Sequence, residues 1–219
     1  MYFADRRDAG RRLAEQLLRY RGGGTLVLAI PRGGVVIGLE VAEALGCQLD
    51  IITPRKLKDP EEPELAIGAV TPDGSAYLNE DVISVRRVSA EYIVGEKARE
   101  QKEALRRLSE YRGSRPYPSL AGKTVIIVDD GIATGATMIA AARDARGMGA
   151  TSVVIAAPVA PDALVSEMSS ESDEFVCLLA SAYFAGVGQF YDRFEQVEDS
   201  EVMRILNSYW SSFGKNKAK

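Results

Sequence analysis

Two adjacent acidic residues, Asp129 and Asp130, follow an apolar run that is typical of a buried strand, and a loop of small residues follows them. The loop leads directly into a helical pattern, so its backbone amides and the positive end of the helix would face one point. Small side chains let the backbone approach a ligand closely, and threonine hydroxyls add donors. We therefore expect a phosphate to bind at Gly131, Ala133, Thr134, Gly135, Ala136 and Thr137.

The two carboxylates would repel such a phosphate unless they serve another part of the ligand, such as sugar hydroxyls or a magnesium ion. Two common nucleotide-binding motifs do not fit the chain. The GxxxxGK[ST] string of a Walker loop is absent, and the first predicted strand is followed by PRGGVVIG instead of the GxGxxG dinucleotide fingerprint. The loop therefore belongs to a different class of phosphate site.

The string VIIVDDGIATGAT at 125–137 resembles the signature with which type I phosphoribosyltransferases bind phosphoribosyl pyrophosphate. The resemblance extends over almost the whole chain and includes PRGG at 31–34, PRKL at 54–57, PELAIGAV at 63–70 and FAGVGQFYDRF at 184–194. The chain is similar to a group of bacterial and archaeal phosphoribosyltransferases without an assigned acceptor. The resemblance implies a transferase that uses Mg2+, moves ribose 5-phosphate to a nitrogenous base and releases pyrophosphate.

The same resemblance implies roles for individual residues. Asp129 and Asp130 would hold the ribose hydroxyls and place Mg2+, and together with Arg32 and Lys56 they are the expected catalytic residues. The glycines beside Arg32 would free the backbone for pyrophosphate, and three further cations stand where a charged, proline-containing segment begins, which is typical of an exposed mobile loop. The expected pyrophosphate-binding residues are Arg32, Gly33, Gly34, Arg55, Lys56 and Lys58.

Short apolar runs without polar alternation are separated by helical patterns, which is typical of a parallel sheet that is covered on both faces. We predict an α/β fold with a doubly wound, mainly parallel five-stranded sheet flanked by helices. The predicted strands lie at 25–30, 49–54, 123–130, 152–158 and 175–180. The predicted helices lie at 5–20, 35–46, 89–111, 161–168 and directly after Thr137.

The expected organisation is a single domain over 1–219, with a core at about 20–180, a flexible loop and hairpin at about 56–79, and a hood over the base at about 181–213. Within the helix at 89–111 we expect Ile93, Ala98 and Leu105 to face inward. The aromatic residues expected to stack on the base are Tyr183, Phe184, Phe190 and Tyr191.

The chain has 219 residues, no histidine and two cysteines, which excludes Ser-His-Asp and Cys-His catalysis and histidine-based zinc sites. With 31 acidic and 27 basic residues, the net charge is −4, so no overall field attracts a polyanion and we expect no nucleic-acid partner. No apolar run approaches the roughly 18 residues of a membrane span. We therefore expect a cytoplasmic protein without a membrane partner.

One departure from the family pattern narrows the range of possible acceptor bases. In the enzymes for 6-oxopurines an acidic residue precedes the Thr-Gly of the signature, whereas Ala133 stands there in this chain. This disfavours hypoxanthine or guanine, and the local string leans toward adenine-type signatures. We also expect a homodimer, because related flexible loops reach a neighbouring subunit. The alternative is a non-catalytic regulator that binds the donor or a nucleotide on the same fold.

Overall fold

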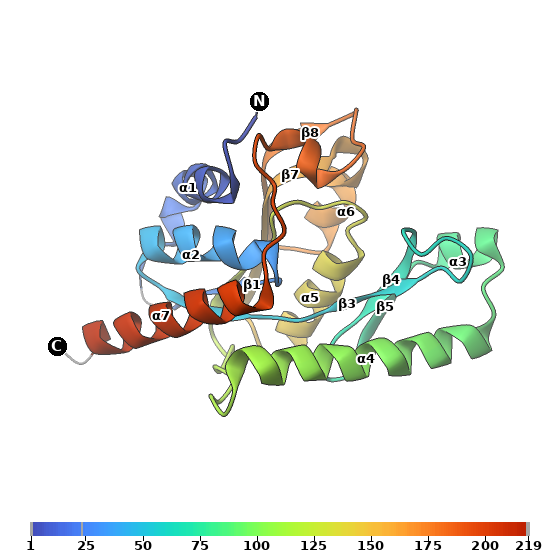
Figure 1. The fold of residues 1–219 in the computed structure, drawn as a ribbon, viewed down its shortest axis with the longest axis horizontal. Coiled ribbons are helices and arrows are strands. Elements are labelled where there is room, and N and C mark those ends of the chain that lie inside the picture. Colours follow the sequence, from blue (N-terminus) through green and yellow to red (C-terminus); the bar gives the residue numbers. More distant parts are fainter. Residues whose placement is uncertain (1, 23, 218–219) are drawn as a thin grey trace.

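A five-stranded sheet in the order β2-β1-β6-β7-β8 lies at the centre of the computed structural model, which describes residues 2–22 and 24–217 (Figure 1). All neighbouring strands are parallel. The predicted α/β class with a five-stranded parallel sheet is therefore confirmed. The strands are β1 (Thr25–Ala29), β2 (Gln48–Ile51), β6 (Thr124–Val128), β7 (Ser152–Pro161) and β8 (Glu174–Ser181).

Helices cover both faces of this sheet, which explains why its strands are apolar on both sides. One face carries α1 (Arg6–Gln16) and α2 (Gly33–Leu45), and α7 (Asp199–Lys217) packs against α2 and β2. The other face carries α5 (Ala136–Gly147) and α6 (Val165–Ser170). The helix predicted at 161–168 is shifted, because Pro161 ends β7 and a short 3-10 turn precedes α6.

A small antiparallel sheet projects from the core on the right in Figure 1. Its strands are β3 (Arg55–Lys58), β4 (Ala66–Val70) and β5 (Ala76–Leu78), and it is accompanied by α3 (Glu80–Arg86) and α4 (Ala90–Arg112). The predicted hairpin is present as β4 and β5. The prediction that a flexible loop begins at residue 56 is wrong, because Lys56 pairs with Ala69 and Leu57 with Gly68, which leaves only 59–65 as the connection.

The inner face of α4 agrees with the predicted one only at Ile93, which packs against the apolar cluster of the small sheet. Leu105 is 48% exposed and Ala98 is also exposed, whereas Glu96 and Glu100 are buried. The two glutamates face inward because their carboxylates are hydrogen-bonded there. Glu100 accepts a hydrogen bond from Arg55 Nε at 2.9 Å, and Glu96 accepts one from the backbone N–H of Lys58 at 3.1 Å. Buried carboxylates that are paired in this way can replace apolar residues on an inner helix face.

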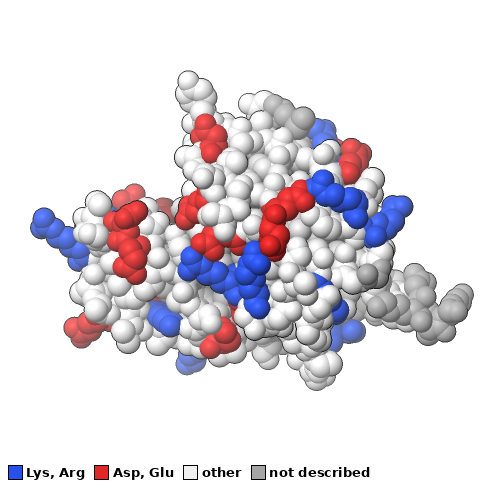
Figure 2. Space-filling view, turned by 180° about the vertical axis from the view of Figure 1, so that it is seen from behind, with Lys and Arg blue, Asp and Glu red and all other residues white. Residues whose placement is uncertain are grey.

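The surface carries charges of both signs. On the face shown in Figure 2, acidic and basic side chains lie next to one another, and several basic ones gather near the middle. Exposed arginines also pair along their own helix, as Arg106 does with Glu103 and Glu110 on α4. Among the described residues, no helix combines the length and apolar character that crossing a membrane requires.

The outer edge of β2 has its backbone acceptors capped by aromatic side chains. In an edge strand every second carbonyl points away from the sheet and would otherwise be unpaired. Here three successive outward carbonyls each accept a hydrogen bond from an aromatic side chain. Cys47 accepts one from the Tyr209 hydroxyl, Leu49 from Trp210 Nε1 at 2.8 Å, and Ile51 from the Tyr117 hydroxyl at 2.9 Å.

This arrangement predicts that Tyr209→Phe lowers the free energy of unfolding by about 1–3 kcal/mol, because a buried carbonyl loses its donor. The measurement is equilibrium unfolding in guanidinium chloride. The matched control is Tyr183→Phe, since the Tyr183 ring is 89% exposed and the same atom is removed; its effect should stay within about 0.5 kcal/mol. Equal effects of the two substitutions would contradict the proposed capping role.

Candidate active site

The functional candidate that contains the acidic pair is a cavity at the carboxyl ends of β1 and β6. The chain leaves β1 toward β2 on one side and β6 toward β7 on the other, so the sheet order reverses between these two strands. Doubly wound sheets bind ligands at such a point. We call this space the first cavity; its volume is about 490 Å3, and its walls come from α1, the turn before α2, β3, the loop between β6 and α5, and residues 187–197.

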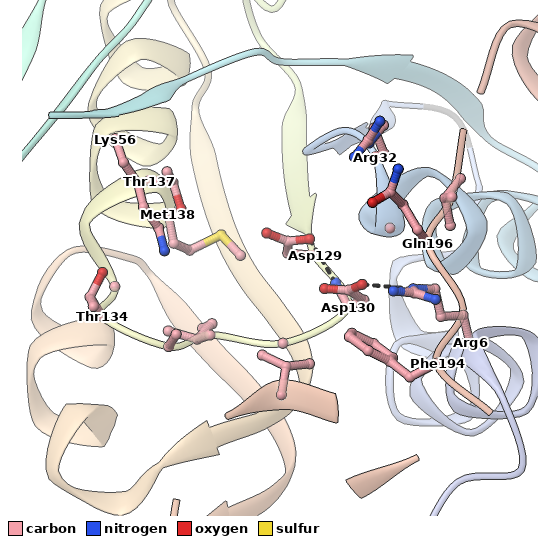
Figure 3. A pocket seen from close by; sticks show the side chains of 17 residues that line it. Arg6, Arg32, Lys56, Asp129, Asp130, Thr134, Thr137, Met138, Phe194 and Gln196 are labelled. Carbon is pink, nitrogen blue, oxygen red and sulfur yellow. Dashed lines mark hydrogen bonds and ion pairs between the residues drawn. The ribbon is translucent and has the colours of Figure 1, made fainter. Parts of the chain in front are cut away.

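The two adjacent aspartates stand in the middle of this cavity (Figure 3). The backbone N–H of Asp130 donates to Asp129 Oδ1 at 2.8 Å. Arg6 donates from Nε to Asp130 Oδ2 at 2.7 Å, and the Tyr191 hydroxyl donates to the Asp130 carbonyl at 2.6 Å. Asp130 therefore has a fixed counterion, whereas Asp129 forms no ion pair within the described residues.

Burial dominates the electrostatics of the pair. It raises the pKa of Asp129 well above the usual range, the neighbouring Asp130 raises it further, and the charge of Lys56 acts against both. Burial also raises the pKa of Asp130, while the Arg6 guanidinium lowers it. Two like charges so close together favour a bound cation or hydroxyl donor between them and the ligand.

The turn between β1 and α2 passes very close to the acidic pair, and its Pro31–Arg32 peptide bond is cis. A Cβ atom on Gly33 would lie 1.8 Å from Asp130 Oδ2 and 2.9 Å from Arg6 Nε, so only glycine fits there. Arg32 lines the same cavity, with its NH1 atom 3.9 Å from Asp199 Oδ1 at the start of α7. The turn thus places the Arg32 cation and the backbone of Gly33, which has no side chain, beside the carboxylates.

The loop between β6 and α5 forms the opposite part of the cavity. Gly135 precedes the first turn of α5 with a φ of 78°, a conformation that favours glycine, and no side chain caps this helix start. The Thr134 hydroxyl is buried and has no hydrogen-bond partner within the described residues. A buried hydroxyl without a partner beside uncapped helix amides is suited to an anionic ligand.

Ten of the predicted site residues line the first cavity together. In the view of Figure 3, Lys56 approaches from one side and Arg32 from the other, with the aspartates between them. The residues that the structure brings together are Asp129, Asp130, Gly131, Ala133, Thr134, Gly135, Thr137, Arg32, Gly33 and Lys56.

Two predicted cations do not line the cavity, and strand geometry explains why. Side chains alternate between the faces of β3, so Lys56 faces the cavity while Arg55 faces α4 and pairs with Glu100. Lys58 lies two positions beyond Lys56, past a register shift in the strand, and is also absent from the cavity wall. The structure therefore does not bring Arg55 and Lys58 together with Lys56 at the cavity wall.

Two small predicted residues support the cavity without lining it. A Cβ atom on Gly34 would lie 2.8 Å from the Val128 carbonyl oxygen, so this glycine allows α2 to approach the end of β6. Ala136 is buried against Ala66 and Ala69 of the small sheet. Both residues therefore contribute to the packing of the elements around the cavity.

None of the predicted stacking aromatics lines the cavity. Tyr183 is 89% exposed, Phe190 and Tyr191 are buried in the core, and Phe184 packs on Phe190 with a ring separation of 5.4 Å. Phe194, which was not among the predicted residues, does line the cavity. It lies inside the aromatic stretch at 184–194, so the sequence pattern indicated the right segment but the wrong aromatic residues within it.

Other cavity residues had no local signal in the sequence. Arg6 belongs to an arginine-rich helix that resembles a solvent-facing surface, yet its guanidinium stacks on Phe194 at 3.8 Å and donates from NH1 to the Glu195 carbonyl at 2.8 Å. The remaining unpredicted wall residues are Ile132, Met138, Val187, Gln196 and Val197.

A divalent metal fits the donor set only in combination with a ligand. Among the described residues, no group of three or more acidic or cysteine side chains could hold a metal ion alone. Mg2+ commonly binds through one or two carboxylates, substrate phosphates and water, and Asp129 and Asp130 supply two carboxylates in a cavity of suitable size. The site therefore suits a magnesium ion that arrives with a phosphorylated ligand.

Known proteins resemble this chain over most of its length. The family model for the phosphoribosyl transferase domain matches residues 4–190. Two proteins of Mycobacterium tuberculosis, provisionally named phosphoribosyl transferases, are each 43% identical over 205 residues, which is 94% of this chain and 46% of theirs. The chain thus spans about half the length of these curated relatives.

A solved structure gives the same result for the fold. The crystal structure of TT1426 from Thermus thermophilus is 39% identical and superposes with a TM-score of 0.80, over 95% of this chain and 99% of that one. These findings confirm the resemblance that the motifs indicated. Since the family model covers most of the chain, the chain belongs to the phosphoribosyl transferase domain family.

Proposed function

We propose that this chain uses 5-phosphoribosyl 1-pyrophosphate and Mg2+ to transfer ribose 5-phosphate to a nitrogenous base, with release of pyrophosphate. The proposal is supported by two features that lie in one cavity: the loop at the start of α5, whose buried Thr134 hydroxyl has no hydrogen-bond partner among the described residues, and the adjacent acidic pair. A ligand with both a phosphate and sugar hydroxyls can bind to the loop through the phosphate and to the acidic pair through the hydroxyls.

The donor's 5-phosphate would lie on the loop between Ala133 and Thr137. The Thr134 hydroxyl would donate to a phosphate oxygen, and the backbone amides that begin α5 would complete the cradle. Neutral small residues suit this role because the phosphate oxygens need close approach to the backbone.

The acidic pair would bind the ribose. Asp129 and Asp130 would accept hydrogen bonds from the ribose hydroxyls, and these carboxylates would hold Mg2+, which when bound would add positive charge beside the leaving pyrophosphate. Arg6 keeps the Asp130 carboxylate in one orientation through its 2.7 Å hydrogen bond. The pair thereby presents fixed acceptors to the sugar.

The bond between the ribose C1 atom and the pyrophosphate oxygen breaks as the base nitrogen attacks C1. Positive charge develops on the sugar ring and negative charge on the departing pyrophosphate, so catalysis is mainly electrostatic. Arg32 and Lys56 would stabilise the pyrophosphate, with the backbone at Gly33 close to it. The carboxylates of Asp129 and Asp130 would stabilise the ring.

The acceptor would lie against the wall formed by residues 187–197. Val187 and Phe194 give this wall apolar surface, and Gln196 adds an amide. Ala133 stands where the 6-oxopurine enzymes carry an acid, which argues against hypoxanthine and guanine. Because the chain has no histidine, the proton that is transferred to or from the base would be carried by a carboxyl, an amine or water.

The function is tested by magnesium-dependent pyrophosphate release from the donor with a panel of nucleobases. We expect turnover with at least one base, and we expect Asp129→Asn combined with Asp130→Asn to abolish donor binding in calorimetry. Circular dichroism of this variant checks that the fold is kept. Unchanged donor affinity in the variant would refute the assignment, and donor binding without turnover across the panel would favour a non-catalytic regulator.

Thr134→Val tests the phosphate cradle separately. Because the hydroxyl has no hydrogen-bond partner among the described residues, its loss should leave the free energy of unfolding unchanged within about 0.5 kcal/mol. Donor binding should weaken by about 1–3 kcal/mol, since a phosphate oxygen loses a donor. The control is Thr151→Val at an exposed threonine, which should change neither quantity. A normal donor affinity in Thr134→Val would place the phosphate elsewhere.

We further propose that the protein is a cytoplasmic homodimer with one catalytic domain per chain. The projecting α3 and α4 carry the strongly exposed apolar residues Val85 and Val94, at 81% and 70%, which supports a partner surface there. Light scattering of the purified chain should give twice the mass of 23.7 kDa. A monomeric mass over the micromolar range would contradict the proposal.

A further inference from the structure

A second cavity of about 250 Å3 lies where the small sheet meets the last turn of α5, and it shares no lining residue with the first cavity. Its position is set by the connection from β2 to β3, the turn between β4 and β5, α4 and α5. The walls are mainly apolar. The apolar contributors are Ile52, Pro72, Leu108, Tyr117 and Met148.

One charged group in this cavity is unexplained by the protein's own contacts. Asp144 is only 6% exposed, and the structure gives its carboxylate no hydrogen bond or ion pair among the described residues. It also lies in the last turn of α5, where the helix dipole disfavours negative charge. Burial, followed by the charge of Asp73, raises the pKa of Asp144 to about 7.

The neighbouring polar groups are already engaged elsewhere. The Asp73 carboxylate accepts hydrogen bonds from the backbone N–H and the hydroxyl of Ser75, at 2.9 and 2.8 Å, within its own turn. The Tyr117 hydroxyl donates to the Ile51 carbonyl at 2.9 Å. None of the described residues that line this cavity is basic. Asp144 is thus the buried polar side chain of this cavity that has no hydrogen bond or ion pair among the described residues.

A buried carboxylate without a partner is unfavourable unless a cation or donor compensates it. The ligand that fits this cavity therefore has one positively charged or strongly hydrogen-bond-donating group and an apolar body. The size agrees, because a dry cavity of about 150 Å3 is enough to hold benzene. An amine-bearing ring of somewhat larger volume would fill the space.

We propose that the second cavity binds a small organic cation, whose protonated amine or amidine pairs with Asp144 and whose apolar body packs between Leu108, Tyr117 and Met148. This site is separate from the proposed catalytic site, and the proposal does not depend on the transferase activity.

The test uses the full chain labelled with 15N, titrated near neutral pH with benzylamine and with its neutral analogue benzyl alcohol. We expect benzylamine to bind at least about tenfold more tightly, because its ammonium group forms an ion pair with the carboxylate, whereas the hydroxyl of the alcohol donates only a neutral hydrogen bond. The amide resonances that shift should include those of Leu108 and Met148. Equal affinities, or shifts confined to residues of the first cavity, would overturn the proposal.

Three variants locate the interaction. Asp144→Asn should remove the preference for the amine, while Asp162→Asn, at an exposed aspartate outside both cavities, should keep it. Leu108→Trp should block both probes by filling the cavity, and Thr134→Val in the first cavity should bind benzylamine as the wild type does. An undiminished amine preference in Asp144→Asn, or undiminished binding in Leu108→Trp, would refute the site.

Discussion

Two adjacent carboxylates at the buried end of β6 are the constraint on which the rest of the site depends. Their mutual repulsion and partial burial would favour protonation unless positive charge stands nearby. That charge comes from distant parts of the chain: Arg6 on α1 pairs with Asp130, and Lys56 on β3 acts on Asp129. The close approach of Gly33 then completes the arrangement, since any side chain there would displace the pair.

This constraint also brings the first helix and the segment before α7 together at the cavity. Arg6 bonds the Glu195 carbonyl and stacks on Phe194, while Tyr191 holds the Asp130 carbonyl. The counterion that orients Asp130 therefore also fixes the segment that would face the base. The proposed donor and acceptor positions would thus be coupled through one guanidinium, so a substitution in α1 at Arg6 should affect both.

The strand, loop and helix around Asp129 could be predicted because their signal lies within thirteen consecutive residues and agrees with the predicted fold. The parallel sheet followed from apolar runs for the same local reason. Arg6 could not be predicted, because its role depends on a contact over 124 positions in the sequence. Arg55 was grouped with Lys56 because the segment was expected to begin a loop, and a loop has no alternation of side chains that would separate the two residues as β3 does.

The aromatic caps on β2 have a consequence for how copies of this protein can associate. A bare edge strand recruits strands from other chains by backbone pairing, and such contacts grow without limit. At β2, ring donors already occupy the outward carbonyls of Cys47, Leu49 and Ile51. A foreign strand would have to displace all three, so association at this flank is restricted to side-chain surfaces, which can close on themselves and stop at a defined number of subunits.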